Sequence, residues 1–312
     1  LRFPQQFIKL LKEKRVDIVH SPLFMTSGYI LWLAALAGVP GRIAHFRSTH
    51  DGQPDTLRRR IQKAVLARMI DRYATNILAV SEGAMNSVWG EGWHDDVRCQ
   101  VVYHGVNAER FRDVRDTQGV REEFGFPPNC HLCIHVGRFA RAKNHVRLVD
   151  IFAKLSSKVP EVRLLMAGDF QDEQITASVR EQIACKNVGD RVVMPGERTD
   201  IPRLLAASDC MIFPSIREGL PGAVLEAGAA GLPALCSDVP GAVEIAAQLP
   251  LVKCLSLDAS DAVWASQAYD MIGIDQSTRE QAQKAFTTTD FTVKSGTRKL
   301  CAIWRQALDG SE

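Results

Sequence analysis

Short apolar runs alternate with longer segments of helical periodicity, and this alternation constrains the fold more than any other feature of the sequence. In the second half the apolar runs occupy residues 131–137, 162–168, 191–196, 209–215, 232–238 and 251–257. Helical patterns lie between them, for example at 144–159 and 200–208. Because each run is continuously apolar rather than alternating, both faces of the strands should be buried. This predicts a parallel sheet with helices on each side.

The first half repeats the pattern less completely and opens on a helical pattern rather than a strand. Strands are expected at 16–20, 41–46, 76–81 and 99–105, and helices at 27–38 and 56–73. Residues 107–129 are charged and turn-rich, and they are expected to form a linker. The chain of 312 residues is long enough for two domains. We expect a partial first domain at 1–118, a second domain at 119–287, and a C-terminal helix at 288–312 that packs back toward the first domain.

Composition and charge narrow the class of protein. The longest apolar run, Tyr29 to Val39, is too short to cross a membrane. Residues 1–118 carry 17 basic and 12 acidic side chains (+5), and residues 119–312 carry 21 and 24 (−3), which suggests an anionic partner or surface for the first half. Most of the eight cysteines lie singly in apolar runs, as expected of reduced thiols in a cytoplasmic protein. Cys130 and Cys133 have C-x-x-C spacing, but no second pair completes a zinc site.

The stretch REGLPGAVLE, residues 217–226, combines two carboxylates with a turn that suits an anion. Ligands of open parallel sheets bind beyond the carboxyl ends of the strands, where this stretch is expected. Gly219 lets the backbone approach a ligand, Pro221 suits the first turn of a helix, and the amino end of that helix favours a phosphate. Glu226, inside the helix, would then hold ribose hydroxyls. Glu218 would face the group beyond the phosphates.

Two cations follow the strand at 131–137, in a turn at the same edge of the predicted sheet. Arg138 offers a planar fork of donors and Lys143 a compact charge, so that together they would hold a diphosphate. A solvated pair on the surface is the alternative. Asp169 and the segment ERTD, which contains Arg198, follow other strands at this edge.

These segments resemble the retaining GT-B glycosyltransferases of family 4. Residues 217–233 resemble the E-x7-E signature of that family, and VGRFARAKN at 136–144 resembles its G-R-x-x-x-x-K-N loop. HGVNAERF at 104–111 is similar to its N-G-V-D-x-x-x-F segment, with His104 and Asn107 where Asn and Asp are usual. RIAHFRSTH at 42–50, followed by a basic helix, is most similar to the branch that builds bacterial surface polysaccharides. The resemblance covers nearly the whole chain.

The resemblance implies two Rossmann-like domains that face a cleft, and it implies roles for individual residues. Arg138 and Lys143 would neutralise the leaving nucleoside diphosphate, and Glu226 would hold the ribose. Glu218 would contact the donor sugar near its reacting carbon. Backbone amides that contact the donor would come from Gly219, Leu220 and Pro221.

Further roles fall outside that turn. Arg198 would lie by the base, through its main chain, and His45 of the first domain would face the donor sugar. His20 and His50 are weaker candidates. Members of the family begin with a strand and a Gly-rich loop, which this sequence does not show, so the first domain is expected to be incomplete.

Sugar transfer from a nucleotide requires stabilisation of the departing diphosphate. Metal-dependent transferases use a D-x-D motif, and no two of the 21 aspartates have that spacing. We therefore expect no metal and no cofactor. The expected donor is a UDP- or GDP-linked sugar, and the expected acceptor is a glycan or a lipid-linked acceptor. A nucleotide-sugar epimerase and a non-catalytic nucleotide-sugar binder remain alternatives. A dinucleotide oxidoreductase is disfavoured because no G-x-G-x-x-G follows a strand, and no nucleic-acid partner is expected.

The predicted helix at 56–73 is basic and carries one apolar stripe. Its apolar stripe consists of Leu57, Ile61, Val65, Met69 and Tyr73, and arginines and a lysine occupy the other faces. Such a helix either lies peripherally on the anionic inner face of the cell membrane or packs its stripe into the core. Both interpretations are consistent with a cytoplasmic protein.

Overall fold

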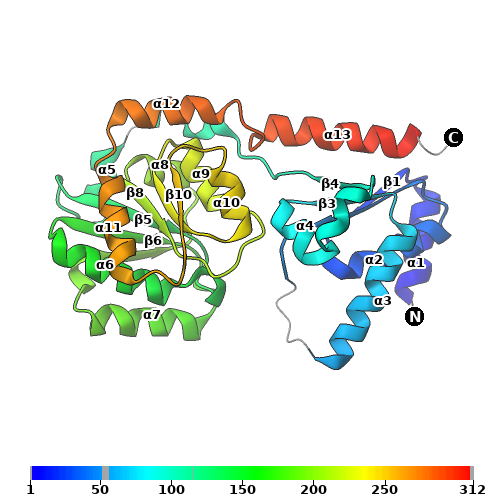
Figure 1. The fold of residues 1–312 in the computed structure, drawn as a ribbon, viewed down its shortest axis with the longest axis horizontal. Helices are drawn as coiled ribbons and strands as arrows, with labels where there is room; N and C mark the ends of the chain where they lie inside the picture. The colour runs from blue at the N-terminus through cyan, green and yellow to red at the C-terminus, as the bar shows by residue number, and fades with distance from the viewer. Residues whose placement is uncertain (1, 51–55, 115, 310–312) are drawn as a thin grey trace. The chain divides into compact units, whose positions relative to one another are not determined.

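The computed structural model describes residues 2–50, 56–114 and 116–309, which form two α/β units (Figure 1). The first unit comprises residues 1–105 and 293–312, and the second comprises residues 106–292. Residues 106–118 and 288–292 thus belong with the second unit. No helix in the described part of the chain is long and apolar enough to cross a membrane.

The first unit is built on a parallel sheet of four strands in the order β1-β2-β3-β4. The strands are β1 (Ile18–Ser21), β2 (Gly41–Phe46), β3 (Asn76–Ala79) and β4 (Cys99–Val101). Its helices are α1 (Arg2–Glu13), α2 (Ser27–Leu36), α3 (Leu57–Tyr73), α4 (Glu82–Trp89) and α13 (Val293–Asp309). The strands and helices predicted for this half are confirmed, with differences of a few residues at their ends.

Helix α13 returns from the end of the sequence to cover this sheet. Its Ile303 is 2% exposed and packs in one cluster with Ile43, Leu78 and Val102. Near its start, Gly296 lies so close to the Tyr103 carbonyl that a Cβ there would crowd it at 2.9 Å. The C-terminal helix therefore completes the hydrophobic core of the first unit.

The second unit contains a parallel sheet of six strands in the order β10-β9-β8-β5-β6-β7. The strands are β5 (His131–Val136), β6 (Val162–Ala167), β7 (Val192–Gly196), β8 (Cys210–Phe213), β9 (Ala234–Ser237) and β10 (Val252–Leu255). Its helices are α5 (Thr117–Glu123), α6 (His145–Lys158), α7 (Glu173–Cys185), α8 (Ile201–Ala206), α9 (Gly222–Ala229), α10 (Pro240–Ala246), α11 (Asp261–Ile272) and α12 (Gln276–Phe286). Every strand predicted for this half is confirmed.

The strand order of this sheet reverses between β5 and β8. From β5 the chain adds β6 and β7 on one side, then crosses back to place β8, β9 and β10 on the other. Loops that leave the carboxyl ends of β5 and β8 therefore diverge. In doubly wound sheets such a reversal forms the crevice in which ligands bind.

The segment at 107–129 is part of the second unit, so its prediction as a linker was wrong. It forms a short 3₁₀ turn at Ala108–Phe111 and helix α5. Arg121 in α5 is 5% exposed and donates hydrogen bonds of 3.1 Å to the carbonyls of Ala207 and Cys130. A charged sequence signalled exposure here, whereas the guanidinium is buried because two backbone carbonyls accept its protons.

Gly168, which follows β6, allows two strand-end loops to touch. A Cβ at this position would overlap the carbonyl of Gly137, the residue that follows β5. The same loops are joined by hydrogen bonds from Gly137 N to Ala167 O (2.9 Å) and from Phe139 N to Asp169 O (2.8 Å).

Replacing Gly168 with alanine should therefore lower the free energy of unfolding by about 1–3 kcal/mol, the usual cost of overpacking. Urea denaturation measures the change. Gly189→Ala is the matched control, because its Cβ would meet nothing closer than a side-chain carbon at 3.9 Å. Equal stability of the two variants would contradict this account of the loop packing.

Candidate functional site

Lys143 and Glu218 form an ion pair at the reversal point of the six-stranded sheet. Lys143 follows β5 and Glu218 follows β8, and the Lys143 Nζ lies 2.7 Å from Glu218 Oε1. The two side chains are only 18% and 13% exposed. The ammonium also lies 4.8 Å from the centroid of the Phe213 ring, within range of a cation–π interaction. Two residues that are 75 positions apart in sequence thus share one partly desolvated site.

Backbone and amide hydrogen bonds hold the two loops together beside this pair. Ile216 N donates to Ala142 O at 2.8 Å, and Asn144 Nδ2 donates to Pro214 O at 3.1 Å. Asn144 has a left-handed backbone (φ 57°), a conformation that asparagine tolerates better than most residues. Asn144 was missed as a functional residue, although its place directly after Lys143 could have suggested it.

Ser215 is a second residue that the sequence analysis missed. Its hydroxyl donates to Glu218 Oε1 at 2.7 Å, so the same carboxylate oxygen accepts from both Ser215 and Lys143. Ser215 is fully buried, and its own carbonyl accepts a hydrogen bond from the Ser237 hydroxyl of β9. Three strand ends therefore fix the orientation of Glu218.

The turn after Glu218 leads directly into helix α9. The helix begins at Gly222, so Pro221 is its N-cap rather than a residue of its first turn, and no side chain caps the backbone amides there. Gly241, in α10, lies so close that a Cβ would overlap the Gly219 carbonyl. Leu220 is 5% exposed. The amino end of α9, with its partial positive charge, thus follows the Lys143–Glu218 pair by only a few residues.

Arg138 and Glu226, two further predicted site residues, differ in their environments. Arg138 is exposed, and none of the described residues makes a hydrogen bond or ion pair with its guanidinium. Glu226 lies in the second turn of α9 and is half-buried. Burial raises the pKa of its carboxyl, and the charge of Arg110 partly offsets that rise. Both groups retain the capacity to bind a ligand.

Arg198 is paired with two carboxylates of the second unit. It follows β7, and its guanidinium lies 2.8 Å from Asp200 Oδ2 and 2.9 Å from Glu123 Oε1. It also lies 5.6 Å from the centroid of Phe124. Its side chain is thus engaged in a network of charges, which leaves its main chain as the part that could contact a base.

Two buried histidines lie behind Lys143. The Nδ1 of His135 donates a hydrogen bond of 2.9 Å to the Ile212 carbonyl, and the His135 ring stacks on Phe213, which also lies beneath the Lys143 ammonium. His145 stacks on Phe139 with ring centroids 4.2 Å apart. Burial lowers the pKa of His145 to about 4 and lowers the pKa of His135 well below its usual value. Both imidazole rings are therefore neutral at pH 7, so they do not repel the positive charge of the Lys143 ammonium.

The predicted histidines of the first unit lie at its own strand ends. His45 in β2 is mostly buried, and its Nδ1 lies 3.0 Å from Nε2 of His20 in β1. Burial, with the charges of His20, Arg47 and His104, lowers the pKa of His45 to about 3. His50 is partly exposed, and its carbonyl accepts a hydrogen bond of 2.7 Å from the Ser48 hydroxyl.

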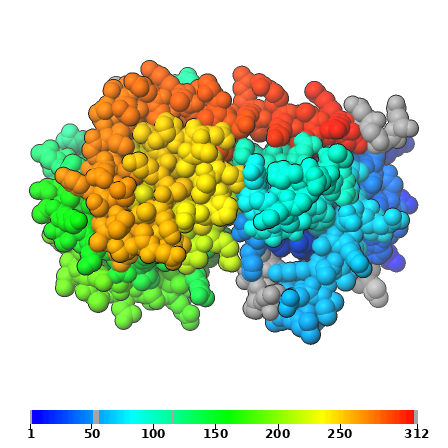
Figure 2. All heavy atoms as spheres, in the orientation of Figure 1, coloured from blue at the N-terminus to red at the C-terminus, as the bar shows by residue number. Residues whose placement is uncertain are grey.

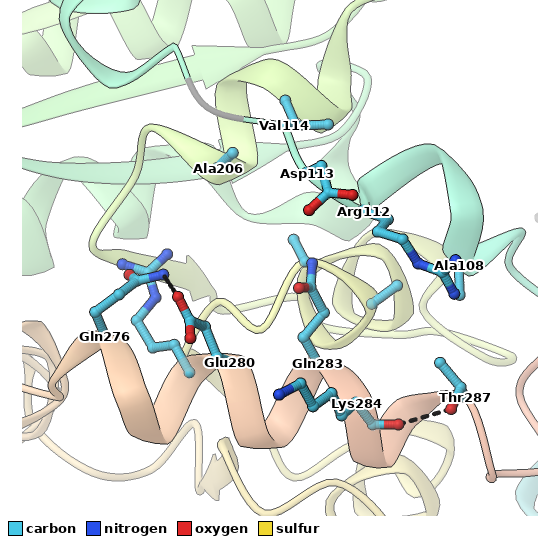
Figure 3. A pocket seen from close by; sticks show the side chains of 13 residues that line it. Ala108, Arg112, Asp113, Val114, Ala206, Gln276, Glu280, Gln283, Lys284 and Thr287 are labelled. Atoms are coloured by element: carbon cyan, nitrogen blue, oxygen red, sulfur yellow. Dashed lines mark hydrogen bonds between the residues drawn. The ribbon is translucent and has the colours of Figure 1, made fainter.

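A hollow of about 460 Å³ also opens in the second unit, but it lies near the amino ends of the strands, opposite to the Lys143–Glu218 site (Figure 3). Ala206 and Ala229, at the ends of helices that lead into β8 and β9, line it together with Gln283 and Lys284 of α12. Arg279 beside it donates to the carbonyls of Gly231 and Ser208. These carbonyls precede the strands, so the hollow is separate from the Lys143–Glu218 site. Within the described ranges, no group of three metal-ligating side chains is found.

Two family models match the chain. Residues 116–251 match the description "Glycosyl transferases group 1", and residues 1–110 match "Glycosyltransferase Family 4".

Curated relatives are bacterial glycosyltransferases. The capsular polysaccharide biosynthesis glycosyltransferase CapH of Staphylococcus aureus is 29% identical over 218 residues, which are 68% of this chain and 57% of CapH. The putative glycosyltransferase EpsF of Bacillus subtilis is 31% identical over 201 residues, 64% of this chain and 51% of EpsF. An Escherichia coli enzyme named UDP-Gal:alpha-D-GlcNAc-diphosphoundecaprenol alpha-1,3-galactosyltransferase is 28% identical over 214 residues, 67% and 54% of the two chains. The chain spans about half the length of these relatives.

Solved structures share the fold. HepE of Anabaena, crystallised with UDP and glucose, superposes with a TM-score of 0.80 at 19% identity, covering 97% of this chain and 81% of HepE. WaaG, described as a glycosyltransferase of lipopolysaccharide biosynthesis, gives a TM-score of 0.72 at 17% identity, covering 95% and 80%. The predicted GT-B class, with two parallel-sheet α/β domains, is thus confirmed, although among the described strands only the six-stranded sheet has the strand reversal of a doubly wound order.

The Lys143–Glu218 contact should be energetically coupled. In a double-mutant cycle with Lys143→Met and Glu218→Gln, we expect a coupling free energy of roughly 1–3 kcal/mol, because both charges are partly desolvated and directly hydrogen-bonded. Chemical denaturation of the four proteins measures it. The pair of Lys9 and Glu13, 75% and 58% exposed, is the matched control and should couple by less than about 0.5 kcal/mol. Purely additive effects at 143 and 218 would contradict the geometry.

Proposed function

We propose that this chain, which belongs to the group 1 and family 4 glycosyltransferases, transfers a sugar from a nucleotide-sugar donor to a glycan or lipid-linked acceptor. We further propose that transfer retains the anomeric configuration and requires no metal ion. The observation that carries the proposal is the Lys143–Glu218 pair at the reversal point of the sheet, followed closely by the amino end of α9.

The donor diphosphate is proposed to bind where three sources of positive potential meet. Lys143 provides a fixed charge, and Arg138 provides a guanidinium with no partner among the described residues. The uncapped amides at the start of α9 provide the third. These groups are in place before the reaction, so they would stabilise the developing charge of the leaving diphosphate without reorganisation. Fixed cations in this role would replace the metal ion that other transferases use.

Glu218 is proposed to face the donor sugar, and Glu226 the ribose. Glu218 accepts from Lys143 and Ser215 through Oε1, so Oε2 is the oxygen that would reach sugar hydroxyls. The half-buried carboxylate of Glu226 accepts hydrogen bonds from a vicinal diol without competing for the phosphates. In retaining transfer, the departing phosphate itself is proposed to take the proton of the acceptor hydroxyl.

The comparisons support the substrate class. HepE was crystallised with UDP and glucose, and one Escherichia coli relative is named for transfer from UDP-Gal to a diphosphoundecaprenol-linked sugar. A UDP-linked hexose is therefore the first donor to test, with a GDP-linked hexose second. CapH, named for capsular polysaccharide biosynthesis, supports a role in making surface polysaccharide.

Lys143→Ala and Glu218→Ala should each lower the rate of sugar transfer by roughly 10²–10³ fold, the effect of losing one preorganised electrostatic contact in the transition state. Product formation from a panel of UDP- and GDP-sugars measures the rate. Lys154→Ala is the matched control, because Lys154 lies exposed on the neighbouring helix α6 and should leave the rate unchanged. Undiminished transfer by the Lys143 or Glu218 variant would refute these roles.

The same assay separates the alternative functions. An epimerase would convert the donor without any acceptor. A binder without activity would show a rise in melting temperature with UDP or GDP but no product, since ligands that bind the folded state stabilise it.

Helix α3 is proposed to contact an anionic membrane. Only Ile70 of this helix is fully buried, and Leu57, Ile61 and Val65 are 73%, 58% and 55% exposed. Figure 2 shows the helix, in light blue, at the surface of the first unit. Arg58 and neighbouring basic residues accompany this stripe, a combination that favours binding at an anionic lipid surface.

The protein should therefore co-sediment with vesicles that contain phosphatidylglycerol at low salt, and less at high salt, because basic residues supply part of the attraction. Serine at Leu57, Ile61 and Val65 together should weaken binding about tenfold or more, since three exposed apolar side chains no longer enter the interface. Val97→Ser, at a single residue that is 94% exposed, is the control and should bind as the parent does. Failure of the parent to bind at low salt would end the membrane proposal.

A further inference from the structure

A line of hydrogen-bonding nitrogens crosses the first unit from the C-terminal helix to β2. The indole Nε1 of Trp304 in α13 donates to His20 Nδ1 at 3.4 Å, and His20 Nε2 lies 3.0 Å from His45 Nδ1. The Trp304 ring meets the His20 ring edge-on at 84°, and the two imidazoles stack with centroids 5.1 Å apart. The two contacts therefore share one imidazole, that of His20.

The direction of these hydrogen bonds follows from the chemistry of indole. An indole nitrogen is a donor only, so His20 Nδ1 must accept and carries no proton. A neutral imidazole has one N–H, which places the proton of His20 on Nε2, where it is donated to His45 Nδ1. The single proton of His45 must then reside on its Nε2.

Both rings are neutral in this arrangement. Burial lowers the pKa of His20, and it lowers the pKa of His45 to about 3 with smaller effects from His20, Arg47 and His104. Neither imidazole therefore carries a second proton at pH 7, and the assignment of one N–H to each ring holds.

The N–H of His45 has no partner in the described residues. Its Nε2 is buried and donates to none of the described residues, although buried polar groups are nearly always paired. His45 borders a hollow of about 440 Å³ at the carboxyl ends of the strands, together with Arg47, Tyr103 and His104. A donor, a charged guanidinium and a phenol at one hollow suit a ligand that presents oxygen atoms.

We propose that Trp304 and His20 are positioning residues that fix the tautomer of His45, so that His45 offers an N–H donor to an oxygen atom of a ligand in this hollow. His45 is therefore not a proton acceptor at that nitrogen. The tautomer assignment is independent of the proposed transferase activity, whereas the ligand contact rests on that proposed function. A sugar hydroxyl and a phosphate both present an oxygen acceptor to this N–H, and the titration below distinguishes the two.

Long-range ¹H–¹⁵N correlation spectra of the full chain, labelled in histidine, test the tautomers directly. We expect protonated Nε2 and unprotonated Nδ1 on both His20 and His45. Trp304→Phe keeps a ring but removes the donor, so the spectra of both histidines should move toward a mixture of tautomers. Trp32→Phe, in α2, is the matched control and should leave them unchanged. Protonated Nδ1 on either histidine in the parent, or unchanged spectra in Trp304→Phe, would overturn the relay.

Titration with glucose and, separately, with inorganic phosphate tests the ligand contact. A shift of the His45 Nε2 signal with one probe supports a contact and identifies the kind of oxygen, while no shift with either probe overturns it. In the transfer assay, His45→Leu should lower kcat/KM about tenfold, the loss expected for one hydrogen bond. His45→Gln, whose amide can donate from a similar position, should recover part of that loss, and equal loss in both variants would count against a donor role. Because the spectra need no turnover, an inactive protein would leave the tautomer result decisive.

Discussion

The pairing of β5 with both β6 and β8 is the constraint on which the second unit depends. Continuous apolar strands require helices on both faces, and β5 is the strand from which the two halves of the sheet grow in opposite directions. The loops that follow β5 and β8 therefore start side by side at the carboxyl ends of these neighbouring strands and then run in opposite directions. Lys143 and Glu218 occupy those two loops, so burial of the sheet, rather than any local motif, brings a cation and a carboxylate to 2.7 Å.

In the proposed phosphate site, such a pair would offset the electrostatic cost of gathering cations before the ligand binds. Unpaired cations in a partly desolvated site would repel one another and would lose hydration without compensation. Glu218 neutralises Lys143 in the structure described here, and Ser215 satisfies the same carboxylate oxygen. A diphosphate that approaches the amino end of α9 can share the Lys143 ammonium without leaving Glu218 unpaired. Arg138 remains exposed and can add its charge when the ligand arrives, since it is not needed to hold the loops together.

The sequence predicted the elements of the fold well because their signals are local. Apolar runs marked every strand of both sheets, and the turn after Glu218 indicated the amino end of a helix within one residue. The parallel-sheet pattern also placed the turns of Lys143 and Glu218 at the same end of the sheet, but it could not predict which side chains of distant segments make contact. The charge of Arg121 suggested an exposed linker, whereas its guanidinium is buried against the carbonyls of Ala207 and Cys130 and lies 3.5 Å from the Asp209 carboxylate. Ser215 and Asn144 were not predicted because no sequence motif indicates their hydrogen bonds, to the Glu218 carboxylate and to the Pro214 carbonyl. The roles of all the predicted site residues toward a substrate stay predictions, namely those of Glu218, His45, Arg138, Lys143, Arg198, Gly219, Leu220, Pro221 and Glu226.

Contacts of the C-terminal helix in the first unit could not be predicted from local patterns either. This helix both packs against the sheet and donates a hydrogen bond to a histidine of β1. Ile303 enters the core beside Ile43, and the next residue, Trp304, directs its indole to His20. Once the apolar side chain is buried, helix geometry determines where the adjacent indole lies, so the orientation of Trp304 is a consequence of core packing. A donor at that point selects one tautomer of His20, and His20 in turn selects that of His45. The hydrogen-bonding character of a strand-end histidine is thus determined by a residue 259 positions later, which no pattern around His45 could reveal.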